Sequence, residues 1–243
     1  MPPRSFTAMG AVDGWQNHQH MIGIDTYYDR AEVSNSDLTE LHKFFLPENI
    51  VLDLTRAYRE GNMVDAMITE PERCDHLRMR IDDEQFTRDE WEMGKRMLDA
   101  YLKDDFCMSM LKQSAGQKVF SLADFQMEMD GIDFSLPVRC KYDLFNTVAG
   151  FGGDIKTTAA TTQKGFEQAF HHFDYPRSRA WYMDISGAER DVVIGISKSR
   201  PHKIFKIFIK RGDAIYSHGR DSYMQLAFRW WYLFGEINKE VLV

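Results

Sequence analysis

The chain has 243 residues, enough for one well-packed domain without requiring a second. Its hydrophobic content of 44% and charged content of 28% are typical of a soluble globular protein, and we find no membrane span and no signal peptide. Three widely spaced cysteines give no disulfide framework and predict reduced thiols in the cytoplasm. The net charge of −7 argues against nucleic-acid binding through overall positive charge, so such binding would need local basic residues or bound cations.

Residues 1–30 show no clear periodicity and are expected to form an N-terminal arm, followed by a single domain over 31–243. A helix start is predicted where Ser36 or Asp37 can act as the N-cap and Glu40 can close a capping box. Leu38 and Phe45 belong to the apolar stripe of this helix.

A second helix is predicted over 52–69, and its apolar face is interrupted by Asp65. A carboxylate in that position needs a partner, a cation or a metal ion, or else it must remain neutral. Two interpretations of Asp65 therefore remain: it pairs with a nearby arginine, or it binds a metal ion.

Residues 87–113 have a helical pattern in two pieces that divide after Lys103. A hairpin should follow, with a strand over 118–129, a turn at Asp130–Gly131 and a second strand over 134–145. Alternation in the second strand places apolar residues on one face and charged residues, including Asp143, on the other. The apolar set is Phe134, Leu136, Val138, Cys140, Tyr142 and Leu144.

A glycine-rich turn, with Gly150, Gly152 and Gly153, should lead into a strand that reads Asp154-Ile155-Lys156-Thr157. If Ile155 enters the core, Asp154 and Lys156 project together on the opposite side, close to Asp143. Paired carboxylates can hold Mg²⁺ or Mn²⁺, and an adjacent lysine can orient or activate a water that attacks a phosphodiester. Asp-x-Lys is a short motif, so a surface strand with a salt bridge is the alternative reading.

The remaining chain predicts a helix capped by Thr161 or Thr162, a helix near 176–184, strands over 192–199 and 203–211, and a helix over 214–238. Phe166, Phe170 and Phe173 are spaced to face the core. Arg177 or Arg179 could hold a phosphate. Basic residues gather near the last two strands: Lys198, Arg200, Lys203, Lys206, Lys210 and Arg211.

The order of these features resembles the PD-(D/E)xK nuclease superfamily: a strand with Asp143, a glycine-rich turn, a strand with Asp154 and Lys156, and then a helix. More narrowly, the chain is similar to the exodeoxyribonuclease VIII-like proteins of bacteria and phages. Their helix motif, a glycine followed four residues later by a residue that is usually His, matches Gly61 and Asp65 here. A later family motif has a Gln four residues before a Tyr, which corresponds to Ser178 and Tyr182.

This resemblance implies an α/β fold with a central mixed β-sheet flanked by helices. It also implies a Mg²⁺- or Mn²⁺-dependent exonuclease that hydrolyses phosphodiester bonds at duplex DNA ends, in recombination or phage replication. DNA, a strand-annealing recombination protein and further copies of the chain are the implied partners.

By the same resemblance, the catalytic residues are Asp143, Asp154 and Lys156. The metal ligands are Asp65, Asp143, Asp154 and the Ile155 backbone carbonyl, and the substrate contacts are Thr157, Arg177, Ser178 and Tyr182. Two alternatives remain: a structure-specific endonuclease that uses the same site, and an inactive module that binds DNA or a partner.

Overall fold

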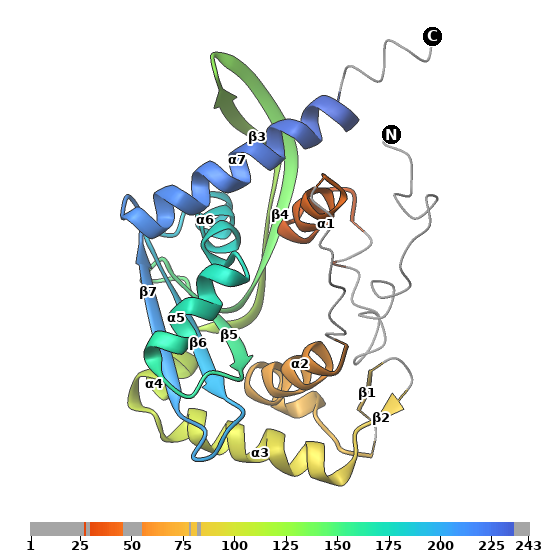
Figure 1. Cartoon of the computed structure of the whole chain (residues 1–243), viewed down its shortest axis with the longest axis vertical. Helices are drawn as coiled ribbons and strands as arrows, with labels where there is room; N and C mark the ends of the chain where they lie inside the picture. Colours follow the sequence, from red (N-terminus) through yellow and green to blue (C-terminus); the bar gives the residue numbers. More distant parts are fainter. Residues whose placement is uncertain (1–26, 28–29, 46–54, 78, 82–83, 236–243) are drawn as a thin grey trace.

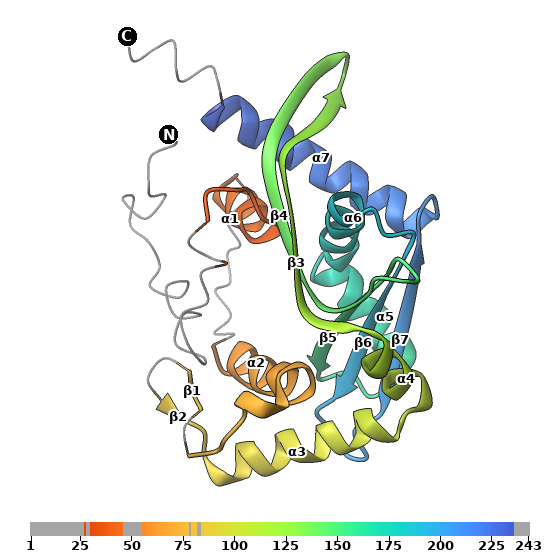
Figure 2. The ribbon, with the colours of Figure 1, turned by 180° about the vertical axis from the view of Figure 1, so that it is seen from behind.

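The computed structural model describes residue 27 and residues 30–45, 55–77, 79–81 and 84–235. Most of the expected N-terminal arm therefore lies outside the described residues. Figure 1 and Figure 2 show the ribbon from opposite sides.

A five-stranded mixed sheet forms the centre of the fold, in the order β3-β4-β5-β6-β7. The strands are β3 (Ala115–Met129), β4 (Ile132–Asn146), β5 (Phe151–Thr158), β6 (Arg190–Ser197) and β7 (Ile204–Lys210). Neighbouring strands are antiparallel except β5 and β6, which are parallel. Two further short strands, β1 (Arg80–Ile81) and β2 (Glu84–Gln85), pair with each other. The predicted α/β fold with a mixed sheet is confirmed.

Helices cover both faces of this sheet and enclose two hydrophobic clusters. The helices are α1 (Asn35–Phe45), α2 (Thr55–Thr69), α3 (Arg88–Lys103), α4 (Asp105–Gln113), α5 (Gln163–His172), α6 (Tyr175–Ser186) and α7 (Ala214–Phe234), with a short 3-10 helix over Pro71–Arg73. One cluster joins α2, α3 and α4 to side chains such as Ile155 and Ile194. The other joins α1, α5, α6 and α7 to β4. The two layers are visible in Figure 1 as α2–α4 and α5–α7.

The start of α1 differs from the prediction, because the capping box joins Ser34 to Asp37 and so lies three residues earlier than a box closed by Glu40. Ser34 Oγ accepts from the Asp37 amide at 3.4 Å, and Asp37 Oδ2 accepts from the Ser34 amide at 2.7 Å. Glu40 instead makes an ion pair with Lys43. At α3 the cap is Thr87, whose hydroxyl accepts from Glu90 while Glu90 binds back to the Thr87 amide.

The six apolar residues predicted on one face of β4 are all buried, but they do not share one face: Leu144 belongs to the cluster with α2–α4, whereas the other five belong to the cluster with α5–α7. The hairpin turn at Asp130–Gly131 is confirmed. The glycine-rich turn is shorter than expected, because Gly152 and Gly153 lie within β5. A Cβ on Gly152 would come within 2.1 Å of the Tyr142 ring, so this strand position requires glycine. The prediction for Phe173 is wrong: it follows the last turn of α5 and is 48% exposed.

The β3–β4 hairpin is long, and α7 crosses it near its tip (Figure 1 and Figure 2). The ring of Phe134 in β4 packs against Phe228 and Trp231 of α7, at centroid distances of 5.4 and 5.6 Å. The predicted extension of α7 to residue 238 lies outside the described residues. Within the described chain, no helix combines the length and the apolar character needed to cross a membrane.

Candidate active site

Two functional side chains are placed by strand alternation in β5. Ile155 is buried in the cluster with α2–α4, while Asp154 and Lys156 project to the other side. Asp154 Oδ2 lies 2.7 Å from Lys156 Nζ, and the same ammonium lies 3.5 Å from the Ile155 carbonyl oxygen. The Lys156 ammonium therefore contacts two of the oxygens that were predicted to bind a metal ion.

Asp143 joins this pair where β4 and β5 separate. Only three residue pairs connect the two strands, ending with Leu144 opposite Gly153. Beyond that point the Ile155 amide donates to Asp143 Oδ2 at 2.7 Å. The side chain of Asp143 thus accepts the hydrogen bond that a backbone carbonyl of β4 would accept if the pairing continued. Asp143, Asp154 and Lys156 are thus brought together.

Asp65 reaches the same region from α2, and Gln117 from β3 holds it. The Gln117 side-chain amide donates to Asp65 Oδ2 at 3.0 Å and to Thr69 Oγ1 at 2.9 Å. Asp65 Oδ1 is buried and has no hydrogen-bond partner among the described residues. One carboxylate oxygen of Asp65 therefore remains available for a ligand.

Burial and mutual charge interactions shift the pKa values of Asp65, Asp143, Asp154 and Lys156. Burial and the charge of Asp143 raise the pKa of Asp65 well above its usual range. Burial and the charge of Asp154 likewise raise the pKa of Asp143. Burial alone would raise the pKa of Asp154, but Lys156 and Arg179 lower it. Negative charge is therefore poorly compensated at Asp65 and Asp143, while Asp154 is held ionised.

Lys156 remains an ammonium in this environment. Burial would lower its pKa, but the carboxylates of Asp154 and Asp143 outweigh burial and raise it. The ammonium also lies over the ring of Tyr175, 5.8 Å from the centroid. Lys156 is therefore suited to donate hydrogen bonds and to stabilise negative charge.

Arg179 is the main site residue whose position the sequence did not reveal. It is 1% exposed, and its Nη1 lies 2.6 Å from Asp154 Oδ1 while its Nε lies 3.1 Å from Asp191 Oδ2. Its guanidinium also lies over the rings of Tyr182 and Tyr142. Both carboxylates and both rings contact this guanidinium, and its Nη2 has no hydrogen-bond partner among the described residues. The suggested phosphate contact of Arg179 stays a prediction.

The residues proposed for substrate contact occupy varied positions. Tyr182 is half-buried and packs against Tyr142, with ring centroids 5.2 Å apart. Ser178 donates to the Tyr175 carbonyl within its own helix, which leaves its hydroxyl engaged locally. Thr157 is half-buried and faces Gly61, where an added Cβ would lie 3.5 Å from its hydroxyl. Their roles as substrate contacts stay predictions.

Arg177 is 4% exposed and contacts α1 and the N-cap residue of its own helix, α6. Its Nη2 donates to Thr39 at 2.8 Å, and its Nε lies 3.2 Å from Asp174. Burial lowers its pKa, and Nη1 has no hydrogen-bond partner within the described chain. This free donor group is the feature that keeps Arg177 a candidate for substrate contact.

The predicted basic cluster is partly neutralised by ion pairs. Lys198 lies 2.7 Å from Glu60 and Lys206 lies 2.6 Å from Asp104. Arg211 binds Asp184 and the carbonyls of Met183 and Ala188. Arg200, Lys203 and Lys210 are exposed. The cluster is therefore not one continuous basic surface.

Carboxylate oxygens and a backbone carbonyl are the donors that hard divalent cations prefer. In their present side-chain positions, however, no three His, Cys, Asp or Glu residues of the described chain form a metal-binding group. The orphaned Asp65 Oδ1 and the poorly compensated charge at Asp65 and Asp143 nevertheless fit a cation at this place.

Two site residues besides Arg179 were missed by the sequence reasoning. Gln117 was noted ahead of the first strand but was given no role, and Asp191 was not singled out. Asp191 is the second residue of β6, the parallel neighbour of β5, and an apolar run follows it directly. That run is the signal by which a buried carboxylate there could have been suspected.

The fold defines a class: an α/β architecture with a five-stranded mixed sheet between helices, consistent with a restriction-endonuclease-like core. Among solved structures, the chain is similar to the "Putative exonuclease" of Eubacterium rectale, with a TM-score of 0.51 and 14% identity over 78% of this chain and 70% of that one. It also matches a phage related exonuclease of Haemophilus somnus 129PT, with a TM-score of 0.35 and 10% identity over 82% of this chain and 96% of that one. No protein-family model and no curated protein matches the chain. At these identities the likeness concerns the fold alone.

Proposed function

We propose that this protein is a metal-dependent DNA exonuclease that acts at the ends of duplex DNA. The observation that carries the proposal is the convergence of Asp143, Asp154 and Lys156 where β4 and β5 separate. The fold shared with the protein from Eubacterium rectale, whose name includes exonuclease, supports the general class of activity.

Mg²⁺ or Mn²⁺ would be held by Asp143 and Asp154, with Asp65 and the Ile155 carbonyl as further ligands. When bound, the ion would polarise the scissile phosphate and lower the pKa of a bound water. The unpaired Asp65 Oδ1 and the raised pKa values of Asp65 and Asp143 support this assignment.

Lys156 would act as a hydrogen-bond donor and as a positive charge. Because its pKa is raised, it keeps its proton and can orient the attacking water or stabilise charge that develops on the phosphate. Arg179 would act as a positioning residue, since it holds Asp154 Oδ1 and thereby fixes the orientation of the carboxylate. Gln117 would do the same for Asp65.

Tyr182, Thr157, Arg177 and Ser178 remain proposed substrate contacts. For Arg177 the support is its unpartnered Nη1, and for Tyr182 it is the ring close to Arg179. A role in recombination or phage replication, a strand-annealing partner and a homo-oligomer are proposals that follow from the sequence resemblance.

The test uses purified protein with Mg²⁺ and two substrates, an end-labelled linear duplex and a covalently closed circle. We expect digestion of the linear duplex from its ends and no cleavage of the circle. Asp154→Asn and Lys156→Ala should each abolish digestion. Cleavage of the closed circle would identify an endonuclease instead, and undiminished digestion by either variant would refute the assigned roles. Labelling the 5′ and 3′ ends separately gives the polarity.

A second candidate is a module that binds DNA or a partner without catalysis. It is favoured by the absence of a complete three-ligand group among the described residues and by Asp65 at the family's His position. Calorimetric titration with Mn²⁺ separates the two. Binding in the millimolar range or tighter supports the enzyme, whereas no binding supports the inactive module.

A further inference from the structure

A run of aromatic side chains leads from the candidate active site to the protein surface. The Lys156 ammonium lies 5.8 Å from the centroid of the Tyr175 ring, which is half-buried at the start of α6. The Tyr175 ring stacks on that of Phe173, with 5.8 Å between the centroids and 29° between the ring planes. Phe173 is 48% exposed. Two successive contacts therefore connect the Lys156 ammonium to an exposed aromatic ring.

The Tyr175 hydroxyl is accessible at this place. Within the part of the chain that the structure describes, it makes no hydrogen bond, and it is not one of the buried polar atoms without a partner. Burial raises its pKa, Lys156 lowers it, and the charges of Asp154 and Tyr58 raise it further. The hydroxyl therefore keeps its proton. Tyr58 of α2, which is 54% exposed, is a second accessible ring close to the site.

The turn between α5 and α6 holds the Phe173 ring outside the core. The Phe173 amide donates to the Ala169 carbonyl at 2.9 Å and so completes the last turn of α5. Asp174 then takes a left-handed conformation, with a φ of +51°, and directs the chain into α6. The Asp174 carboxylate lies 3.2 Å from Arg177 Nε and accepts from the Ser222 hydroxyl at 3.4 Å. Contacts from α6 and α7 thus fix the turn that carries Phe173.

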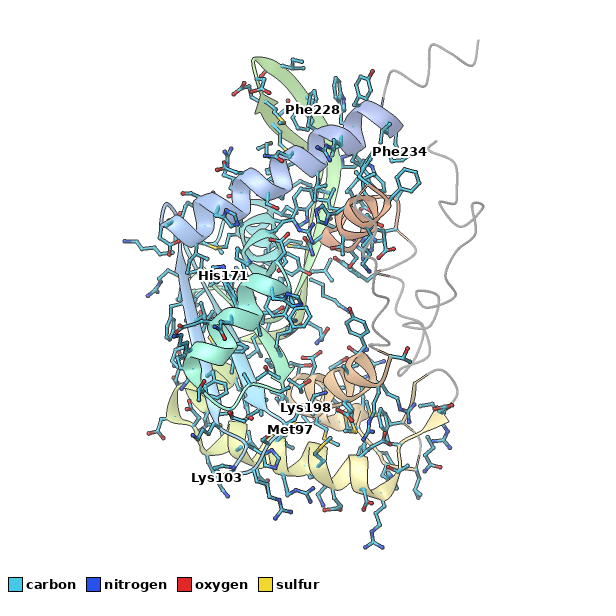
Figure 3. All side chains as sticks on the ribbon, in the orientation of Figure 1. Met97, Lys103, His171, Lys198, Phe228 and Phe234 are labelled. Carbon is cyan, nitrogen blue, oxygen red and sulfur yellow. The ribbon has the colours of Figure 1, made fainter. Side chains whose placement is uncertain are left out.

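The residues before Phe173 suit a nucleic-acid strand. The His172 ring packs edge-on against Phe173, with 4.9 Å between the centroids. His171 and His172 are both exposed, and each imidazole can donate a hydrogen bond to a phosphate oxygen. Figure 3 labels His171 in this last turn of α5. An exposed aromatic ring, held in place and flanked by hydrogen-bond donors, is the arrangement by which proteins bind single-stranded DNA.

We propose that Phe173, backed by Tyr175, is a stacking platform for an unpaired base beside the scissile phosphate. Because Lys156 marks the place of that phosphate only if the proposed nuclease function holds, the platform rests on that function. Tyr175 covers one side of the Phe173 ring, and the exposed remainder is open to a base. Every nucleobase has a flat face, so the platform accepts any sequence. One phenyl ring covers one base rather than a base pair, so the substrate is a DNA end whose terminal bases are unpaired.

The first test measures kcat/KM on a linear duplex whose two nucleotides next to the first scissile phosphate are either normal or abasic. On the normal end, Phe173→Ala should lower kcat/KM about tenfold, the effect expected when one stacked base is lost. On the abasic end, Phe173→Ala and the wild type should have equal kcat/KM, because no base remains to stack. Equal values on the normal end, or the same loss on both ends, would overturn the proposal.

Phe173→Trp and Phe208→Ala are the control variants. Tryptophan keeps a stacking surface, so Phe173→Trp should retain the wild-type kcat/KM on the normal end. Phe208 of β7 is 54% exposed, and its ring contacts Phe106 of α4. Phe208→Ala should leave kcat/KM unchanged, and thermal unfolding shows that each variant has the native fold. An equal loss of kcat/KM in Phe208→Ala would refute a specific role of Phe173.

DNA ends of different pairing test the predicted substrate class. We expect the wild type to have a higher kcat/KM on a duplex with mismatched terminal pairs than on a fully paired duplex of the same length. A mismatched base does not have to be separated from its partner before it stacks on the protein. Equal kcat/KM on the two duplexes would show that the terminal bases stay paired and would overturn the assignment of an unpaired base.

Binding without a metal ion separates this inference from the proposed function. With EDTA present, a single-stranded oligonucleotide should bind about tenfold more weakly to Phe173→Ala than to Phe208→Ala. If the wild type digests DNA and Phe173→Ala keeps full affinity and activity, the nuclease function stands and the platform is refuted. If the wild type digests no DNA, the proposed function fails, and binding that depends on Phe173 still supports the platform.

Discussion

At the scale of single residues, Asp154 is placed between two cations of different kinds. Arg179 is fully enclosed by protein and bonds one oxygen, while Lys156 has a partly exposed side chain and contacts the other. The buried guanidinium of Arg179 joins Asp154 to Asp191 and so holds β5 and β6 to α6. Under the proposed function, the Lys156 ammonium is the cation that a metal ion or a substrate would displace.

Lys156→Gln should therefore bind Mn²⁺ more tightly than the wild type while losing nuclease activity. Removing a positive charge next to the proposed ligands favours a divalent cation by about tenfold or more, given the strength of a charge–charge interaction at this separation. Calorimetric titration measures the affinity. Lys164→Gln, on the exposed face of α5, is the control for the change in net charge. Weaker Mn²⁺ binding in Lys156→Gln would contradict the position we give to the ion.

Gln117→Ala should reduce kcat/KM by about 10–100-fold, as is common when a group that orients a metal ligand is removed. The glutamine donates to Asp65, so its loss raises the pKa of Asp65 further and frees the carboxylate to turn. Gln126→Ala is the matched control, since this glutamine is exposed on the same strand. Equal rates for Gln117→Ala and the wild type would remove Gln117 from the site.

Asp191 makes a pH-dependent contribution to stability. Burial raises its pKa from 3.8 to about 6, although Arg179 lowers it. Between these two pH values the folded protein keeps the proton that the unfolded chain releases, so the free energy of unfolding falls as the pH rises.

Compared with Asp191→Asn, the wild type should therefore lose about 2 kcal/mol of stability between about pH 4 and pH 7. Urea unfolding of both proteins at each pH gives the difference. A difference that does not change with pH would show that the carboxyl group titrates normally.

Strand alternation predicted that Asp154 and Lys156 project to the same side of their strand, and the resemblance to the nuclease superfamily associated Asp143 with them. Strand alternation could not place Gln117 against Asp65, because the two residues are 52 positions apart and meet only when β3 packs beside α2. The sequence also did not show which of Arg177 and Arg179 would bind a buried carboxylate. Arg179 binds Asp191, and Asp191 lies in a strand that follows later in the chain.

At the scale of elements, the separation of β4 and β5 creates the site. The two strands share three residue pairs, whereas β5 and β6 share eight. The amide of Ile155 is left without a ladder partner at this point and binds Asp143 instead. The carboxylate of Asp143 in the candidate site is thus positioned where the pairing of β4 with β5 ends, and the sequence did not define that point.

The element order itself was predictable, because helix caps and strand alternation are local signals. Thr162 caps α5, as one of the two threonines predicted for that role, and the β3–β4 hairpin turns at Asp130–Gly131 as expected. The wrong predictions concern features that depend on contacts between elements far apart in the sequence, or on where an element ends. Phe173 has the spacing of a core residue, but α5 ends at His172 and leaves it exposed.

Gly219→Ala should destabilise the protein by about 1–3 kcal/mol, because α7 and α6 approach each other too closely for a side chain at this position. A Cβ on Gly219 would lie 2.1 Å from the carbonyl oxygen of Pro176. Chemical unfolding is the measurement, and His218→Ala at an exposed neighbouring position is the control. A native free energy of unfolding for Gly219→Ala would show that the two helices are free to separate.

At the scale of the whole molecule, two helical layers cover the sheet. The acidic and basic side chains are unevenly distributed over this fold. The net charge of −7 obscures this distribution. The candidate active site combines carboxylates with Lys156 and Arg179, and Lys198 and Lys206 are paired with carboxylates elsewhere. A mixed sheet flanked by helices followed from the sequence, but this arrangement of charge depends on which elements pack together.

The most direct test of the account is the rate of digestion of a linear duplex, measured against Mg²⁺ concentration for the wild type and Asp154→Asn. We predict a rate that rises to saturation with Mg²⁺ for the wild type and that stays at background for the variant. A wild-type rate that is independent of Mg²⁺, or a variant with the same dependence as the wild type, would contradict the central claim.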